Sequence, residues 1–323
     1  MGLSNVTGVL SRYFIIGFFL PVFAALVAYS QAVSSQLLPA VYEQQSAGTQ
    51  IAILGGAALL AGLVLLGLNH PIMRAYEGYP LMRIDGWASA SRRGRDAGRL
   101  RRLAHWAVAG LIAIQAERRG ELKTIRDGPA DESAQTVAAW QLDCRYPRRR
   151  RDLLPTAFGN VIRAFELHSS HRWGLDAIAV QPRITALLSA QELEIEADAR
   201  SEAAFFVNLS LLSLLLTAVS LIDLVAFRSG SWVEILAPAV PLLLSWMFYR
   251  ASIGAAERWG NTVRSTVDLH RLELYERLGV IAPTSFTEER TIIGPAVSRC
   301  LLHGNRLPDE LRARPNTTAK EDT

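Results

Sequence analysis

The chain has 323 residues, half of them hydrophobic, and its 34 basic and 30 acidic residues give a formal net charge of +4. So high an apolar fraction favours a membrane protein over a pair of soluble domains. The near balance of charges argues against a nucleic-acid partner. The sequence has no GxxxxGK, GxGxxG, GxSxG or CxxC pattern, which argues against an ATPase, a Rossmann enzyme and an α/β-hydrolase.

Four apolar segments approach the length of about 20 residues with which a helix crosses a bilayer. The last two each carry one acidic residue, Asp223 or Glu234, close to one end. The sequence therefore predicts an all-α, polytopic membrane protein with four transmembrane helices. The predicted spans are 13–30 and 51–68, in a first hairpin within 1–69, and 204–227 and 232–249, in a second hairpin within 204–250.

The distribution of basic residues predicts the orientation. Residues 31–50 contain no Lys or Arg, whereas 70–203 contain 21 and the chain from Arg250 onward contains 11. Because cytoplasmic loops carry the excess of basic residues, we expect both termini and the 70–203 region in the cytoplasm of a cell-membrane protein. An alternative interpretation of residues 1–30 is a cleaved signal, which Pro21 within the apolar run disfavours.

The region outside the spans is predicted to be helical and rich in arginine. A long helix over 91–127 ends at Gly128–Pro129, and a second helix runs from there to Tyr146–Pro147. The segment Ser189–Glu192 matches a capping box and starts a helix that continues into the third span. The last predicted segments are a helical cytoplasmic tail over 251–311, interrupted at Gly279 and restarted by a second capping box at Ser285–Glu288, and a disordered end over 312–323.

The most unusual stretch is "RRRRDLLPTAFGNVIRAFELHSSHRWGLDAIAVQPR", residues 148–183. Helical spacing from about Pro155 to Gly174 places Phe158, Ile162 and Phe165 on one apolar face. Mid-helix Gly159 predicts close approach of another helix or of the lipid surface. Two interpretations of the arginine run stay open: a solvated charge cluster, or contact with the anionic leaflet or a partner. The candidate contact residues are Arg148, Arg149, Arg150, Arg151, Phe158, Ile162 and Phe165.

Two histidines follow in the same stretch. His168 and His171 lie on the apolar side of the predicted helix, and Glu166 points roughly away from His168. They are weak candidates for metal ligands because no third ligand accompanies them, unless Asp176 folds back. We expect them to be packed at the end of a helix, whose dipole favours them there. The sequence therefore predicts no metal, no cofactor and no catalytic residue.

A stripe of small polar residues marks the third span. Its spacing of three and four residues places the hydroxyls on one helical face. The stripe is interpreted either as a seam for helix packing or as the lining of a pore. In the fourth span Pro238 and Pro241 predict a kink. The stripe consists of Ser210, Ser213, Thr217, Ser220 and Asp223.

Three sequence blocks carry a resemblance to a known group of proteins. They are "RAYEGYP" at 74–80, "YP…LLPTAFGNVIRAFE…GLDAIAVQPR" between 146 and 183, and "VDLHRLELYERLG" at 267–279. Together they resemble an uncharacterised group of actinobacterial four-span membrane proteins, over most of the chain and in the same order. The resemblance implies a shared fold and no activity. The order of spans also resembles the layout of bestrophin-type channels, without their sequence motifs.

Two functions from different classes remain open at this point. The first is a non-catalytic membrane protein whose helical cytoplasmic region binds a partner or the anionic leaflet. The second is an oligomeric ion channel or transporter lined by the third span, and a third, more distant, is an enzyme that uses the His168/His171 region. The expected partners are the lipid bilayer, further copies of the chain and a cytoplasmic protein.

Overall fold

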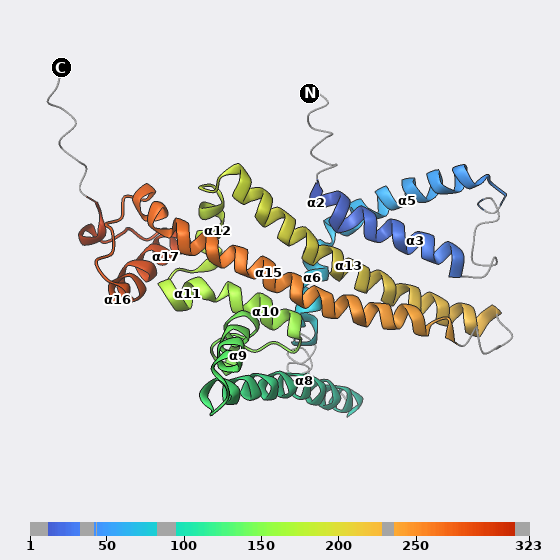
Figure 1. The fold of residues 1–323 in the computed structure, drawn as a ribbon, viewed down its shortest axis with the longest axis horizontal. Coiled ribbons are helices and arrows are strands. Elements are labelled where there is room, and N and C mark those ends of the chain that lie inside the picture. The colour runs from blue at the N-terminus through green and yellow to red at the C-terminus, as the bar shows by residue number, and fades with distance from the viewer. Residues whose placement is uncertain (1–11, 33–41, 43, 83–94, 228–235, 314–323) are drawn as a thin grey trace, which may run out of the picture. The chain divides into compact units, whose positions relative to one another are not determined.

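The computed structural model describes residues 12–32, 42, 44–82, 95–227 and 236–313. This part of the chain is almost entirely helical and contains no β-strand, only an isolated bridge between Val280 and Arg312. Four helical segments are long and apolar enough to cross a membrane, namely Arg12–Gln31, Ala47–Gly67, Ala190–Ala226 and Ala239–Arg277. The predicted all-α polytopic membrane fold is thereby confirmed (Figure 1).

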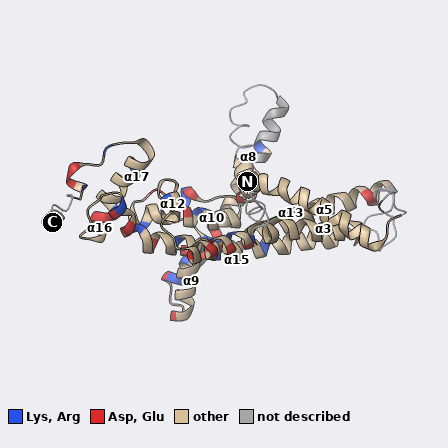
Figure 2. Cartoon of the chain, turned by 90° about the horizontal axis from the view of Figure 1, so that it is seen from above, with Lys and Arg blue, Asp and Glu red and all other residues tan. Residues whose placement is uncertain are grey.

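The chain divides into two compact units that cut across the predicted segments. Unit 1 comprises residues 1–115, 154–159 and 197–259, and unit 2 comprises 116–153, 160–196 and 260–323. The first two spans belong to unit 1, together with residues 197–226 of the third and 239–259 of the fourth. Their helices α3 (Leu20–Ala32) and α5 (Ala47–Gly67) lie side by side and carry no charged residue, as Figure 2 shows by their tan colour.

Pro21 shapes the first span. The residues before it form α2 (Arg12–Phe14) and a five-residue π-helix, η1 (Ile15–Phe19). Proline has no backbone N–H, so the carbonyl of Gly17, four residues earlier, loses its usual helical donor. Asn208 in α13 (Ala190–Phe227) replaces that donor, because its Nδ2 lies 2.7 Å from the Gly17 oxygen. A side chain of the third span thus satisfies a polar group that lipid could not.

The third and fourth spans are joined by paired serines. Ser210 Oγ donates to the carbonyl of Ser245 in α15 (Ala239–Arg277), and Ser245 Oγ donates to the carbonyl of Ser210, each over 2.9 Å. Both residues are buried. Small hydroxyl residues allow this close approach of two backbones.

A close helix contact explains Gly159. This residue lies in α10 (Ala157–Glu166), and a Cβ placed on it would overlap the carbonyl oxygen of Glu77 and lie 2.8 Å from Thr156 Oγ1. Glu77 ends α6 (Asn69–Glu77), and Thr156 Oγ1 donates to the carbonyl of Tyr76 over 2.7 Å. The predicted close approach is therefore made by another helix. It also brings together the "YEGYP" and "LPTAFGN" blocks, which lie about eighty residues apart.

Unit 2 forms its own hydrophobic core around the end of α15. Short helices pack there: α11 (His168–Trp173), α12 (Ala177–Thr185), α16 (Phe286–Glu288), the π-helix η4 (Glu289–Ile293) and α17 (Gly294–His303). Leu175, Val180 and Ile184 from one sequence block contact the cluster that contains Leu274 and Tyr275 from another. These blocks are therefore explained by packing.

Polar side chains also join the helices of the same core through an ion pair, a cation–π contact and a hydrogen bond. The Arg271 guanidinium carbon lies 3.6 Å from the centre of the Trp173 ring, and Arg271 Nε donates to Glu289 Oε1 over 2.9 Å. Trp173 Nε1 donates to Asp268 Oδ1 over 2.6 Å. A buried ion pair is thus stacked on an indole whose own N–H is also satisfied.

Several predicted boundaries differ from the structure. The helix expected from Pro155 to Gly174 is interrupted at Leu167 and becomes α10 and α11. At Pro238, where a kink was expected, a turn at Ala237 and Pro238 separates the helical Leu236 from α15, which begins at Ala239. Pro241 then lies in the first turn, where a missing N–H leaves no helical bond unmade.

The chain end also differs in part from the prediction. Arg312 and Ala313 were expected to be disordered, but Arg312 forms the bridge with Val280, and the Ala313 N–H donates to the Gly279 carbonyl over 2.8 Å. The remainder of that segment, 314–323, lies outside the described residues, as do half of the loop 31–50 and all of the turn 228–231.

Candidate functional site

A pocket of unit 2 lies between two consecutive helices, α8 (Arg95–Asp127) and α9 (Glu132–Arg145). Gly128–Pro129 ends the first helix, as predicted, and the Asp131 carboxylate caps the second by accepting the Ser133 N–H. Gln135 Nε2 closes the turn by donating to the carbonyls of Gly128, over 2.8 Å, and Ala130, over 3.1 Å. The connection is therefore short and well bonded.

The far end of α9 is held by a buried arginine. Arg264 of α15 is 8% exposed, and its Nη2 donates to the carbonyl of Asp143 over 2.8 Å and to that of Cys144 over 3.4 Å. Its Nη1 donates to Asn261 Oδ1 over 3.2 Å, and the Cys144 thiol lies 3.4 Å from the same oxygen. A cation at the carbonyl end of a helix interacts favourably with the helix dipole. This anchor fixes the wall of the pocket.

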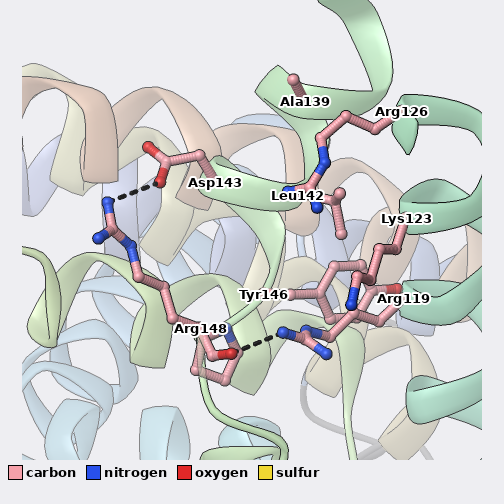
Figure 3. A pocket seen from close by; sticks show the side chains of 9 residues that line it. Arg119, Lys123, Arg126, Ala139, Leu142, Asp143, Tyr146 and Arg148 are labelled. Carbon is pink, nitrogen blue, oxygen red and sulfur yellow. Dashed lines mark hydrogen bonds and ion pairs between the residues drawn. The ribbon is translucent and has the colours of Figure 1, made fainter. Parts of the chain in front are cut away.

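The pocket has a volume of about 370 Å³ and is lined mainly by basic and apolar side chains (Figure 3). Arg119, Lys123 and Arg126 come from successive turns of α8 and therefore share one face. Arg148 enters from the segment after α9. The complete lining is Arg119, Lys123, Arg126, Ala139, Leu142, Asp143, Tyr146, Pro147 and Arg148.

The four cations of the pocket are unequally neutralised. Arg126 forms two hydrogen bonds with Asp127, over 2.7 and 3.0 Å, and Arg148 lies 3.8 Å from Asp143. Arg119 Nη2 donates to a neutral group, the Arg148 carbonyl, over 2.6 Å. In the described part of the chain no ion pair joins Arg119 or Lys123 to a carboxylate, so the pocket holds a surplus of positive charge.

Tyr146 and Pro147 are the buried members of the lining. Burial raises the pKa of the Tyr146 phenol above its ordinary value, because the charged phenolate would lose its hydration. The phenol therefore stays neutral and adds no negative charge to the basic pocket.

The predicted arginine run is partly in this pocket. Arg148 lines it, and Arg151 lies 4.0 Å from Asp152. The apolar residues that were candidates for contact with the leaflet or a partner lie inside the fold, since Phe158, Ile162 and Phe165 are 0, 5 and 8% exposed. A leaflet contact by this stretch therefore depends on the arginines alone.

The two histidines do not gather metal ligands. His168 Nε2 lies 3.1 Å from Asp268 Oδ1, and the Asp176 carboxylate caps α12 by accepting the N–H groups of Ile178 and Ala179. Among the residues that the structure describes, no three His, Cys, Asp or Glu side chains cluster as a metal site. Burial lowers the pKa of His168, and burial and then the positive charges of Arg148 and Arg149 lower that of His171.

The stripe of the third span is mostly buried within unit 1. Ser210, Thr217, Ser220 and Asp223 are each less than a tenth exposed, while Ser213 is partly exposed. Ser210 bonds across to Ser245, whereas Thr217 Oγ1 donates within its own helix to the Ser213 carbonyl over 2.9 Å. Glu234 and Arg228 lie outside the described residues.

Sequence reasoning missed Arg119, Lys123, Arg126 and Tyr146 as members of one site. The spacing of the three α8 cations, at i, i+4 and i+7, is a signal that could have found a basic helical face. It could not have shown that α9 and Tyr146 close that face into a pocket. Comparison of the chain with protein-family models, curated proteins and solved structures finds no match.

Proposed function

We propose that this multi-pass membrane protein is a binding protein without a catalytic role, and that its helical region outside the spans binds the anionic leaflet of the membrane. The observation that carries the proposal is the surplus of positive charge at the pocket between α8 and α9. Each basic side chain near an anionic membrane surface contributes about 1 kcal/mol to binding. The exposed Arg149, Arg150 and Arg151 follow Arg148 directly and extend the same basic segment.

The proposal includes the predicted orientation, with both termini and the 70–203 region in the cytoplasm. Cys300 tests it, since this free thiol is partly exposed while Cys144 is buried. A membrane-impermeant maleimide should leave Cys300 unlabelled in intact cells and label it after lysis. Labelling in sealed, intact cells would reverse the orientation, and Cys300→Ser provides the matched control.

The alternative functions find less support. His168, which a catalytic hypothesis would use, shares Asp268 with the Trp173 N–H in a packed network. For a channel lined by the third span, Ser210 is already engaged with the fourth span. We therefore favour packing as the role of the stripe.

The leaflet contact is tested with the full chain in lipid nanodiscs. We expect amide exchange over 116–153 to slow in discs that contain phosphatidylserine relative to discs of phosphatidylcholine alone. Raising the salt concentration should remove the difference, because a Debye length of about 10 Å at 0.1 M falls to about 3 Å at 1 M.

Charge variants provide the control for this experiment. Replacing Arg149, Arg150 and Arg151 by glutamine should abolish the lipid dependence. Arg299→Gln, which removes an exposed arginine elsewhere in unit 2, should leave it unchanged. Identical exchange in both lipids would contradict the leaflet contact, and slowing that depends on an added protein would replace it with a protein partner.

A further inference from the structure

We infer that the pocket between α8 and α9 is a phosphate-binding site, with Lys123 and Arg119 as the charge ligands and Tyr146 and Pro147 beneath the organic part of the bound molecule. The inference rests on the proposed function in that both assign an anion to the same basic region. It goes further by naming the chemical class of the ligand and the side chains that hold it.

Positively charged side chains repel one another along α8. Arg119, Lys123 and Arg126 stand three and four residues apart, and like charges at that spacing destabilise a helix. Asp127 forms an ion pair with Arg126, and its charge also acts on Lys123 from a longer distance. The remaining two repel each other without an ion-pair partner in the described residues. An anion bound between them converts this repulsion into attraction.

The Arg119 guanidinium is already oriented by a hydrogen bond within the protein. Arg119 is held by the Arg148 carbonyl at 2.6 Å, which uses one of its five N–H groups. Figure 3 shows the Arg119 and Lys123 side chains close together beside Tyr146. Arg126 and Arg148 are tied to Asp127 and Asp143, so they add positive potential without serving as ligands.

The residue type at position 123 also favours a phosphate ligand. The chain contains 32 Arg and only two Lys, and Lys123 is the one lysine within the described residues. Lysine offers a compact charge with three rotatable donors and arginine a planar fork, and the two together can bind one phosphate. A phosphate dianion neutralises both free cations at once, while a carboxylate neutralises one.

The remainder of the pocket has room and apolar lining for an organic group. Its volume of about 370 Å³ exceeds that of a bare phosphate, and Ala139, Leu142 and Pro147 supply apolar lining. The ligand is therefore a phosphate ester with a small organic part. That chemistry belongs both to a soluble phosphorylated metabolite and to a lipid headgroup such as phosphatidic acid.

The experiment measures binding to the full chain in phosphatidylcholine nanodiscs by calorimetry. The probes are inorganic phosphate, glycerol 3-phosphate, and discs doped with phosphatidic acid, the last read by amide exchange over 116–153. We expect Lys123→Gln and Arg119→Gln each to weaken binding by about 10- to 100-fold, as for a lost hydrogen bond to a charged group. Arg299→Gln, which removes an exposed arginine elsewhere in unit 2, should change it less than about twofold.

Each outcome decides between defined alternatives. Binding of glycerol 3-phosphate that both pocket variants weaken assigns a soluble ester, and a response to phosphatidic acid alone assigns a headgroup. Binding of no probe at millimolar concentration, or equal weakening by Arg299→Gln, overturns the inference. Circular dichroism checks that each variant keeps its helices. Pocket binding without any dependence on phosphatidylserine would remove the proposed leaflet function and leave the phosphate site in place.

Discussion

Polar groups find their partners differently in the spans and in the helical region outside them. In the spans Asn208 donates to the Gly17 carbonyl, and Ser210 and Ser245 donate to each other's carbonyls. In unit 2 one ion pair is buried against Trp173, while Arg119 and Lys123 remain without a carboxylate partner among the described residues. Lipid cannot satisfy a polar group, so the fold must do so, whereas water permits a charge to be kept for a ligand.

The largest effect should come from the buried ion pair of unit 2. Arg271 and Glu289 have side chains 17 and 4% exposed. Glu289→Gln leaves the guanidinium without its carboxylate, and removing one partner of a buried pair destabilises by about 3–5 kcal/mol. Thermal unfolding monitored at unit 2 should show this loss. The double variant R271M/E289L should recover most of it, and a double variant as unstable as the single one would assign the loss to packing.

Next in size is the helix contact of unit 1. Gly159→Ala places a methyl against the Glu77 carbonyl and should destabilise by about 1–3 kcal/mol through overpacking. Gly120→Ala, in α8, meets nothing within 4 Å and should instead stabilise by up to about 1 kcal/mol. Chemical denaturation of both variants measures the contrast. Equal behaviour of the two would contradict the close approach.

The pH dependence of unit 2 should be smaller. Burial lowers the pKa of His168 below the ordinary 6.5, so below about pH 6.5 the unfolded chain binds the proton more readily than the folded one. This contribution to stability is therefore complete above pH 6.5 and is lost as the pH falls, at no more than about 1.4 kcal/mol per pH unit. Comparing melting temperatures of the native chain and His168→Gln from pH 7.5 to 5 isolates it. A parallel decline in both would exclude His168.

A weaker coupling should connect Asn208 with Pro21. Asn208→Ala removes the donor to the Gly17 carbonyl, and a hydrogen bond between membrane helices contributes about 0.6 kcal/mol on average. In a Pro21→Ala background residue 21 regains its N–H and can donate to that carbonyl itself, so Asn208→Ala should have less effect. A double-mutant cycle measures this difference, and its absence would separate the two residues.

The smallest effect should be that of Thr217→Val. The Thr217 hydroxyl donates within its own helix, so its removal should change stability by less than about 0.6 kcal/mol. We also expect no ion flux in liposomes from the native chain, from Thr217→Val or from Asp223→Asn. Flux that the two variants reduce would favour the channel and overturn the packing role of the stripe.

Local signals were sufficient for most of the helices. The capping box at Ser189 forms as predicted, with Ser189 Oγ 3.3 Å from the Glu192 nitrogen and the Ser189 N–H donating to Glu192 Oε2. At Ser285 only half of the predicted box forms: Ser285 Oγ lies 3.1 Å from the Glu288 nitrogen, but the Glu288 carboxylate accepts the Thr284 N–H. Gly279 and Gly304 take the left-handed conformation that follows a helix. Such features depend on residues a few positions apart, so the sequence contains them in full.

The sequence by itself determined the all-α class, the four spans and those helix ends that carry a capping residue or a glycine, because hydrophobic length and capping residues act locally. The tertiary structure decided which helix faces remained exposed and which were buried. Phe158, Ile162 and Phe165 had the pattern of a surface-binding face, yet the fold buries them. The pocket likewise needs α9 and Tyr146 beside α8, and the Gly17 carbonyl needs a side chain from residue 208. These contacts join positions far apart in the chain, and periodicity within one helix carries no information about its neighbour.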